Sequence, residues 1–174
     1  MIVMTLISIS IIAAAVIYLA YNAISLANFG IPHSLSMTYY LWNEKDGRGW
    51  LFCLMMYIVV ALMMPAWITM SEGSDFQFLA FLAPAALLFV GTAPRFLAGG
   101  TERRVHETSA YAAAACSLAW VILVTPYWWT IPAWLVLVAA VALRTRSVTR
   151  SLVYWLETIA FGSTFTSAIL YSLQ

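Results

Sequence analysis

Charged side chains are scarce in this chain. Asp, Glu, Lys and Arg make up 9% of its 174 residues, whereas 64% of the residues are hydrophobic. Soluble domains contain roughly 45–50% apolar residues, so this composition excludes an ordinary soluble domain and predicts a membrane protein. The net charge is only +1, which argues against nucleic-acid binding, because that function requires a basic stripe.

Cysteine and short catalytic motifs are also rare or missing. Cys53 and Cys116 both lie in apolar runs, so we interpret them as small packing residues and not as a disulfide framework. The chain has no glycine-rich phosphate loop and no H-E-x-x-H, G-x-S-x-G or C-x-x-C pattern. Its motifs therefore predict no cofactor and no metal site.

What the sequence has in abundance is long apolar segments. A helix needs about 20 apolar residues to cross a bilayer. We therefore predict an all-α, single-domain bundle of six transmembrane helices, spanning approximately residues 2–27, 50–70, 75–96, 102–125, 130–143 and 148–173. The first segment has no basic n-region and a long apolar core, so we interpret it as a retained helix and not a cleaved signal peptide. Tyr and Trp within residues 34–42 favour the headgroup level and predict a short interfacial or re-entrant helix.

The distribution of Lys and Arg predicts an orientation. The first, third and fifth connections, counted with the adjoining helix ends, hold two, three and three of the eight basic residues. The other connections and both termini hold none. Because basic loops stay in the cytoplasm, we predict a bacterial inner-membrane protein with three cytoplasmic loops and both termini outside.

Glu157 is the carboxylate that lies deepest inside a predicted span. It lies roughly 10 Å beyond Arg150 along the helix, and an acidic residue in mid-membrane costs at least ~2.5 kcal/mol, so it should face a partner or water. Its helical stripe, which can line a cavity or a seam, comprises Arg150, Tyr154, Glu157, Phe161 and Thr164. Two interpretations stay open. Glu157 either makes a structural bond to Arg104, His106 or Tyr154, or it handles a proton or cation.

His106 and Glu107 open the fourth span at the same predicted depth. Small residues follow His106 on its face of the helix and leave room for a ligand. The alternatives are a capping histidine, or a metal site formed with His33, Glu107 and Glu157, for which the spacing carries no signature. The candidates for handling a ligand or ion are therefore Glu157, His106, Glu107, Tyr154 and Arg150.

A basic and aromatic group of residues lies on the predicted cytoplasmic side. Each cation near anionic lipid contributes about 1 kcal/mol of binding, so these residues are candidates for contacting headgroups. The alternative is that they only determine topology. The group comprises Arg95, Arg103, Arg104, Tyr39 and Tyr40.

Three segments, residues 34–41, 49–52 and 76–80, together with the His106 that follows them, resemble a group of small, uncharacterised multipass bacterial membrane proteins. The resemblance covers roughly residues 30–110. It implies a bacterial origin and a multipass fold, and it implies no activity and no functional residue.

Three functions are compatible with these patterns. The first is a cytoplasm-facing polar cavity that binds or transports a small molecule, ion or lipid. The second is an intramembrane enzyme acting on a lipid or isoprenoid, with Glu157, His106 and Glu107 as acid–base groups. The third is a structural subunit whose face of small residues, Gly162 with Thr166 or Ser163 with Ser167, meets another chain. The expected partners are membrane lipids and a second copy of this chain.

Overall fold

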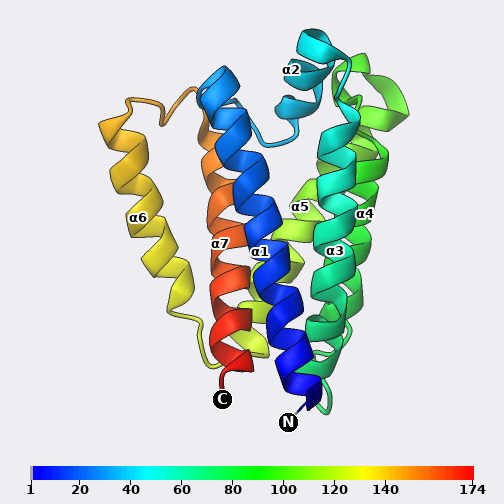
Figure 1. Ribbon diagram of the computed structural model, residues 1–174, viewed down its shortest axis with the longest axis vertical. Coiled ribbons are helices and arrows are strands. Elements are labelled where there is room, and N and C mark those ends of the chain that lie inside the picture. Colours follow the sequence, from blue (N-terminus) through cyan, green and yellow to red (C-terminus); the bar gives the residue numbers. More distant parts are fainter. Residues whose placement is uncertain (1) are drawn as a thin grey trace.

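The computed structural model describes residues 2–174, with side chains from Met4 onward, and this part of the chain contains helices and no strands (Figure 1). The all-α prediction is therefore confirmed. The helices are α1 (Ile2–Phe29), α2 (Met37–Asp46), α3 (Trp50–Met70), α4 (Leu79–Thr92), the 3-10 turn η1 (Phe96–Ala98), α5 (Gly100–Leu123), α6 (Thr130–Arg144) and α7 (Leu152–Ser172). Among the described residues, α1 from Met4 and α3 are long and apolar enough to cross a membrane.

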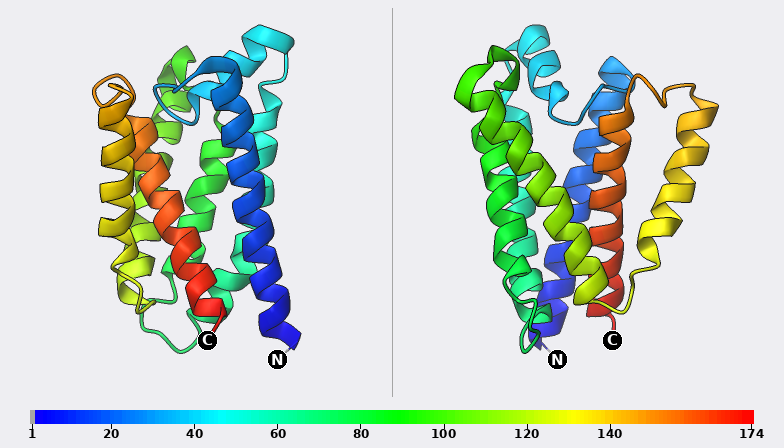
Figure 2. Two further views of the ribbon diagram at one scale, coloured as in Figure 1. Left: turned by 60° about the vertical axis from the view of Figure 1, so that its left-hand side comes forward. Right: turned by 180° about the vertical axis from the view of Figure 1, so that it is seen from behind.

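Five long helices close into a ring. The neighbours around this ring are α1 with α3, α3 with α4, α4 with α5, α5 with α7, and α7 with α1. The sixth long helix, α6, lies outside the ring and packs on α7, as both views of Figure 2 show. The ring encloses the core, so side chains that point inward from α3, α5 and α7 face one another.

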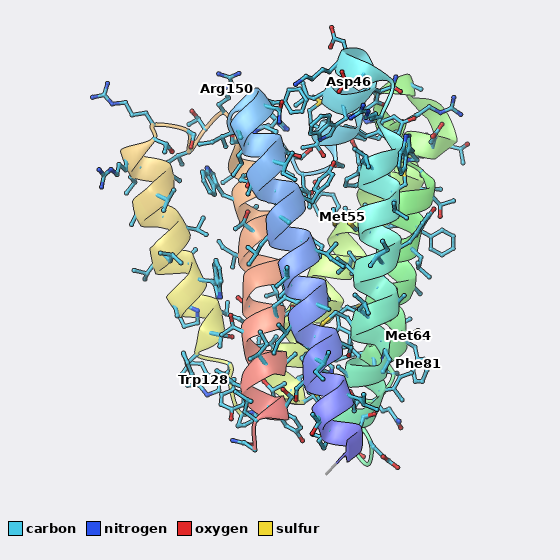
Figure 3. All side chains as sticks on the ribbon, viewed as in Figure 1. Asp46, Met55, Met64, Phe81, Trp128 and Arg150 are labelled. Carbon is cyan, nitrogen blue, oxygen red and sulfur yellow. The ribbon has the colours of Figure 1, made fainter. Side chains whose placement is uncertain are left out.

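The two ends of the bundle consist of different parts of the chain. The N- and C-termini lie at one end, whereas α2 and the connections α4–α5 and α6–α7 lie at the other (Figure 1). Figure 3 accordingly shows Asp46 and Arg150 at the second end and Trp128 toward the first. We call these the terminal end and the loop end. The three segments that hold all Lys and Arg residues are therefore gathered at the loop end.

Two helices are shorter than the predicted segments. The predicted 75–96 segment contains α4, which ends at Thr92 because a proline follows Ala93 and disfavours helical geometry there. Ala93 accordingly has φ −110° and ψ 58°. The predicted 148–173 segment contains α7, which begins only at Leu152, after Arg146 adopts a φ of 53°.

The short helix α2 is fastened along the loop-end half of α1. On both helices, residues with polar groups recur at helical spacing, and each such residue of α1 forms a hydrogen bond with one residue of α2. The pairs are Tyr21 Oη with Thr38 Oγ1 at 2.6 Å, Trp42 Nε1 donating to Ser25 Oγ at 3.0 Å, and Lys45 Nζ donating to Asn28 Oδ1 at 2.5 Å. The predicted short helix at residues 34–42 is thus observed slightly later, and its docking fixes the preceding residues 30–36.

Candidate functional site

A cavity lies inside the helix ring, between α3, α5 and α7. The cavity is narrow: the space inside it that the centre of a water-sized sphere can occupy is about 50 Å³. Side chains from Phe52 to Trp67 on α3 and from Ala110 to Ser117 on α5 form two of its walls. The third wall comes from α7 and includes Glu157, Phe161 and Thr164, which are three residues of the helical stripe identified in the sequence.

Glu157 faces this cavity without a cationic partner. Its Oε2 accepts a hydrogen bond from the backbone N–H of Leu35 at 2.6 Å. The ion pairs found among residues 4–174 are Arg95 with Glu102 and Arg103 with Glu107, so none includes Glu157. The structure therefore provides the carboxyl group with one backbone donor, and not with the arginine or histidine that the sequence allowed.

The donor comes from a segment that is attached to α7 at two points. The backbone N–H of Tyr154 donates to the carbonyl of His33 at 3.1 Å, and Leu35 N–H reaches Glu157 one turn later. Tyr154 lies in the first turn of α7, where backbone N–H groups have no partner within the helix. These two bonds hold Leu35, which is 2% exposed, in the cavity wall.

Tyr154 and Arg150 do not enter the cavity with Glu157. The hydroxyl of Tyr154 instead donates to Asn22 Oδ1 at 3.2 Å and so ties α7 to α1. Arg150 is exposed at the loop end, before α7 begins.

His106 also lies apart from Glu157. The side chain is buried, its Nδ1 is 2.9 Å from the carbonyl oxygen of Ala93, and its ring stacks on Phe96 at a centroid distance of 4.6 Å. It therefore caps the end of α4, where the following proline supplies no N–H. Glu107 points elsewhere and pairs with Arg103 at 2.8 Å, with about half of its side chain exposed. The structure places one of the five ligand-handling candidates, Glu157, on the cavity wall.

The other polar groups on the cavity wall are of two kinds. The hydroxyls of Ser117 and Thr164 donate to carbonyls of their own helices, those of Ala113 and Ala160. The indole N–H of Trp67, in contrast, is buried without an acceptor among the described residues. Trp67 thus has an unused donor, and Glu157 is the one ionisable side chain on the cavity wall.

Sequence reasoning missed Leu35 and Trp67. The contribution of Leu35 is its backbone N–H, which leaves no signature in residue type. In the sequence, Trp67 is an aromatic residue near a proline inside an apolar run. Because aromatic residues at the membrane interface show the same pattern, it does not identify Trp67 as a cavity residue.

The basic and aromatic group lies together around the start of α5. Arg95 and Arg103 are each paired with a glutamate, at 3.5 and 2.8 Å, and Arg104 is exposed. The hydroxyl of Tyr40 accepts a hydrogen bond from Leu97 N–H at 2.8 Å, and Tyr39 contacts Tyr40 edge to face. Two of the three arginines of this group are thus paired with a carboxylate, and Arg104 takes part in neither ion pair.

No cluster of three or more His, Cys, Asp or Glu side chains suited to a metal ion occurs in the described part of the chain. His33, His106, Glu107 and Glu157 are thus not gathered into one such group. The fold and site define an all-α protein with an internal, largely apolar cavity that carries a single carboxyl group. No protein-family model, curated protein or solved structure matches the chain.

Proposed function

We propose that this chain is an integral membrane protein of six spans, and that its cavity binds or transports a small molecule, ion or lipid through Glu157. The observation that carries the functional part is a carboxyl group that faces a cavity and has no cation beside it. An isolated carboxylate in apolar surroundings is expensive. A ligand in the cavity that forms an ion pair or hydrogen bond with Glu157 would offset this cost, and it would explain why the position carries a glutamate.

The outer surface supports the membrane location. Large apolar side chains are exposed on every long helix, for example Leu19, Phe81, Val136 and Leu156. Polar side chains of α7 point inward, and Ser163 and Ser167 are fully buried. This arrangement is the reverse of a soluble bundle, and it explains why α7, which is 21 residues long, has too low an average hydropathy to be recognised as a span.

The collection of all basic segments at the loop end supports the predicted orientation, with that end in the cytoplasm. Single cysteines in a Cys53→Ala/Cys116→Ala background test it. A membrane-impermeant maleimide added to intact spheroplasts should label Trp128→Cys and should label Asp46→Cys only after lysis. Labelling of Asp46→Cys in intact spheroplasts would overturn the orientation.

A flux assay tests the role of Glu157. Proteoliposomes containing the wild-type chain should take up radiolabelled methylammonium or dodecylamine faster than empty liposomes, and Glu157→Gln should abolish the difference. Glu107→Gln is the matched control, because Glu107 is an exposed glutamate paired with Arg103. Equal uptake by the wild type and Glu157→Gln would remove Glu157 from the function.

The geometry favours this proposal over an intramembrane enzyme. General acid–base groups have to reach one shared substrate. The ring of His106 is engaged with Ala93 and Phe96 at the end of α4, and Glu107 is engaged with Arg103. Neither residue lines the cavity that Glu157 faces.

A further inference from the structure

We infer that the cavity takes a single-chain amphiphile, which enters from the lipid between α5 and α7 and places a hydrogen-bond-donating head against Glu157. This inference rests on the proposed function and narrows its ligand. Three features support the inference: the cavity is long and apolar, Glu157 accepts hydrogen bonds, and the cavity reaches the protein surface between α5 and α7.

The cavity has the shape and chemistry of a chain-binding site. Its α3 wall runs from Phe52 to Trp67, which corresponds to roughly 22 Å along the helix axis. Apart from the hydroxyl oxygens of Ser117 and Thr164, the wall below Glu157 is formed by apolar and aromatic side chains, so it offers a hydrated ion few replacements for its water. An apolar chain needs no such replacement and gains about 0.8 kcal/mol for each buried methylene.

Glu157 selects the head of that chain. One oxygen, Oε2, accepts the Leu35 N–H, and the carboxyl group has further lone pairs that can accept. A primary amine or a hydroxyl can donate to it. A carboxylate or phosphate head is disfavoured, because its negative charge would repel the carboxylate of Glu157 beside it. Among the described residues, no basic side chain forms an ion pair with Glu157 that could offset this repulsion.

The exposure of the lining residues locates the entrance. On α3 and α4 the lining side chains are buried, for example Phe52 at 1% and Leu87 at 7%. In contrast, Ala110 and Ala114 on α5, and Glu157 and Phe161 on α7, are partly exposed. The cavity therefore reaches the surface between α5 and α7.

The helices α5 and α7 diverge toward the loop end. Seen from behind, α5 runs obliquely and is separated from α7 toward the loop end, while it approaches α7 toward the terminal end (Figure 2, right). Glu157 lies in the second turn of α7 from the loop end, where the two helices are further apart. The partly exposed lining residues Ala110 and Ala114 are small, and an amphiphile that passes them arrives from a lipid leaflet and not from water.

Equilibrium binding to the full chain in lipid nanodiscs tests the ligand class, with empty nanodiscs correcting for partition into lipid. Dodecylamine and dodecanol should each bind at least tenfold more tightly than methylammonium, and dodecanoate should not compete. Glu157→Gln should weaken dodecylamine binding about tenfold, and a smaller effect on dodecanol would identify a cationic head as the preferred one. If methylammonium binds as tightly as dodecylamine, or if dodecanoate competes fully, the inference is wrong.

The entrance is tested by two neighbouring substitutions. Ala114 lines the cavity, whereas Ala115 is exposed on the outside of the same helix. Ala114→Phe should reduce dodecylamine binding tenfold or more, and Ala115→Phe should leave it unchanged. Equal effects of the two variants would overturn the side entrance.

A labelling experiment covers the case in which Ala114→Phe misfolds. In the background that lacks Cys53 and Cys116, dodecylamine should slow the reaction of Ala114→Cys with N-ethylmaleimide several-fold and should not slow that of Ala115→Cys. Absence of protection at position 114 contradicts the inference.

These results separate the two proposals. If Glu157→Gln changes binding of methylammonium but chain length and Ala114 have no influence, the ligand class is wrong and the proposed function stands. If Glu157→Gln changes binding of none of the probes, the proposed function fails as well.

Discussion

Replacing Glu157 with glutamine should make the protein more stable. At the proposed membrane location a carboxylate costs at least about 2.5 kcal/mol, and Glu157 recovers part of this cost through the bond from Leu35 N–H at 2.6 Å. A hydrogen bond to a charged acceptor contributes about 1.5–3 kcal/mol, against about 0.5–1.5 kcal/mol for a neutral one. Glutamine keeps a carbonyl oxygen that can accept from Leu35 N–H, so the variant loses about 1.5 kcal/mol of hydrogen-bond energy. It also avoids the cost of placing a carboxylate in the membrane, which is larger. We expect a net gain of about 1 kcal/mol in the free energy of unfolding.

Leucine at the same position separates the two contributions. Glu157→Leu also removes the carboxyl group, but it leaves the buried N–H of Leu35 without an acceptor, which costs about 1–3 kcal/mol. The expected order of stability is therefore glutamine above glutamate, and glutamine above leucine by about 1–3 kcal/mol. Detergent–denaturant unfolding titrations followed by tryptophan fluorescence measure all three free energies, provided that the transitions are reversible and two-state.

The order of these stabilities decides between the two interpretations of Glu157. If Glu157→Gln is less stable than the wild type by 1 kcal/mol or more, the carboxyl group stabilises the fold and its role is structural. If glutamine is more stable, the carboxyl group is retained at a cost to stability, as functional groups often are.

Three further variants test the packing. Gly162→Ala would place a Cβ 2.5 Å from the Trp134 ring. We expect a loss of about 1–3 kcal/mol, with hydrogen exchange increasing first in α6, and unchanged exchange there would contradict the contact. Trp120 donates a 2.8 Å hydrogen bond from its indole, whereas Trp67 donates none. Trp120→Phe should therefore lower the free energy of unfolding by about 1 kcal/mol more than Trp67→Phe, and equal losses would refute the assignment. His106→Phe should destabilise the protein by about 1–2 kcal/mol without changing dodecylamine binding, and altered binding would connect His106 to the site.

Much of the fold follows from patterns along the chain. Apolar runs indicate helices, and each of the six predicted segments overlaps one of the helices α1, α3, α4, α5, α6 and α7. The bounds are less predictable where backbone geometry decides them. The 75–96 segment is apolar nearly throughout, yet the proline at position 94 ends α4 at Thr92, because the residue before a proline avoids helical torsion angles.

The site was only partly predictable, for a geometric reason. A carboxylate in an apolar run is conspicuous, and Glu157 does face the cavity. His106 was grouped with it because both lie at a similar depth. Depth along a helix does not fix the face on which a side chain points, and His106 turns toward the end of α4. The partner of Glu157 is a backbone group at a sequence separation of 122 residues, which no pattern in a single sequence reveals.

The polarity of α7 has two separate causes. One face joins α7 to α6, through Thr130 Oγ1 with Ser167 Oγ at 2.8 Å and Trp134 Nε1 donating to Thr166 Oγ1 at 3.0 Å. The other face presents Glu157 to the cavity.

The sequence groups these residues together as the most polar helix, and it allows the face of small residues to meet another chain. The structure fills that face with α6 of the same chain, where Gly162 admits the Trp134 ring. Packing with α6 accounts for the hydroxyls of Thr166 and Ser167 and for the glycine. It does not account for two polar groups of α7: the buried hydroxyl of Ser163, which has no hydrogen-bond partner among the described residues, and the carboxyl group of Glu157, which is the one of the two that lines the cavity. For that reason the functional proposal rests on Glu157 and not on the general polarity of the helix.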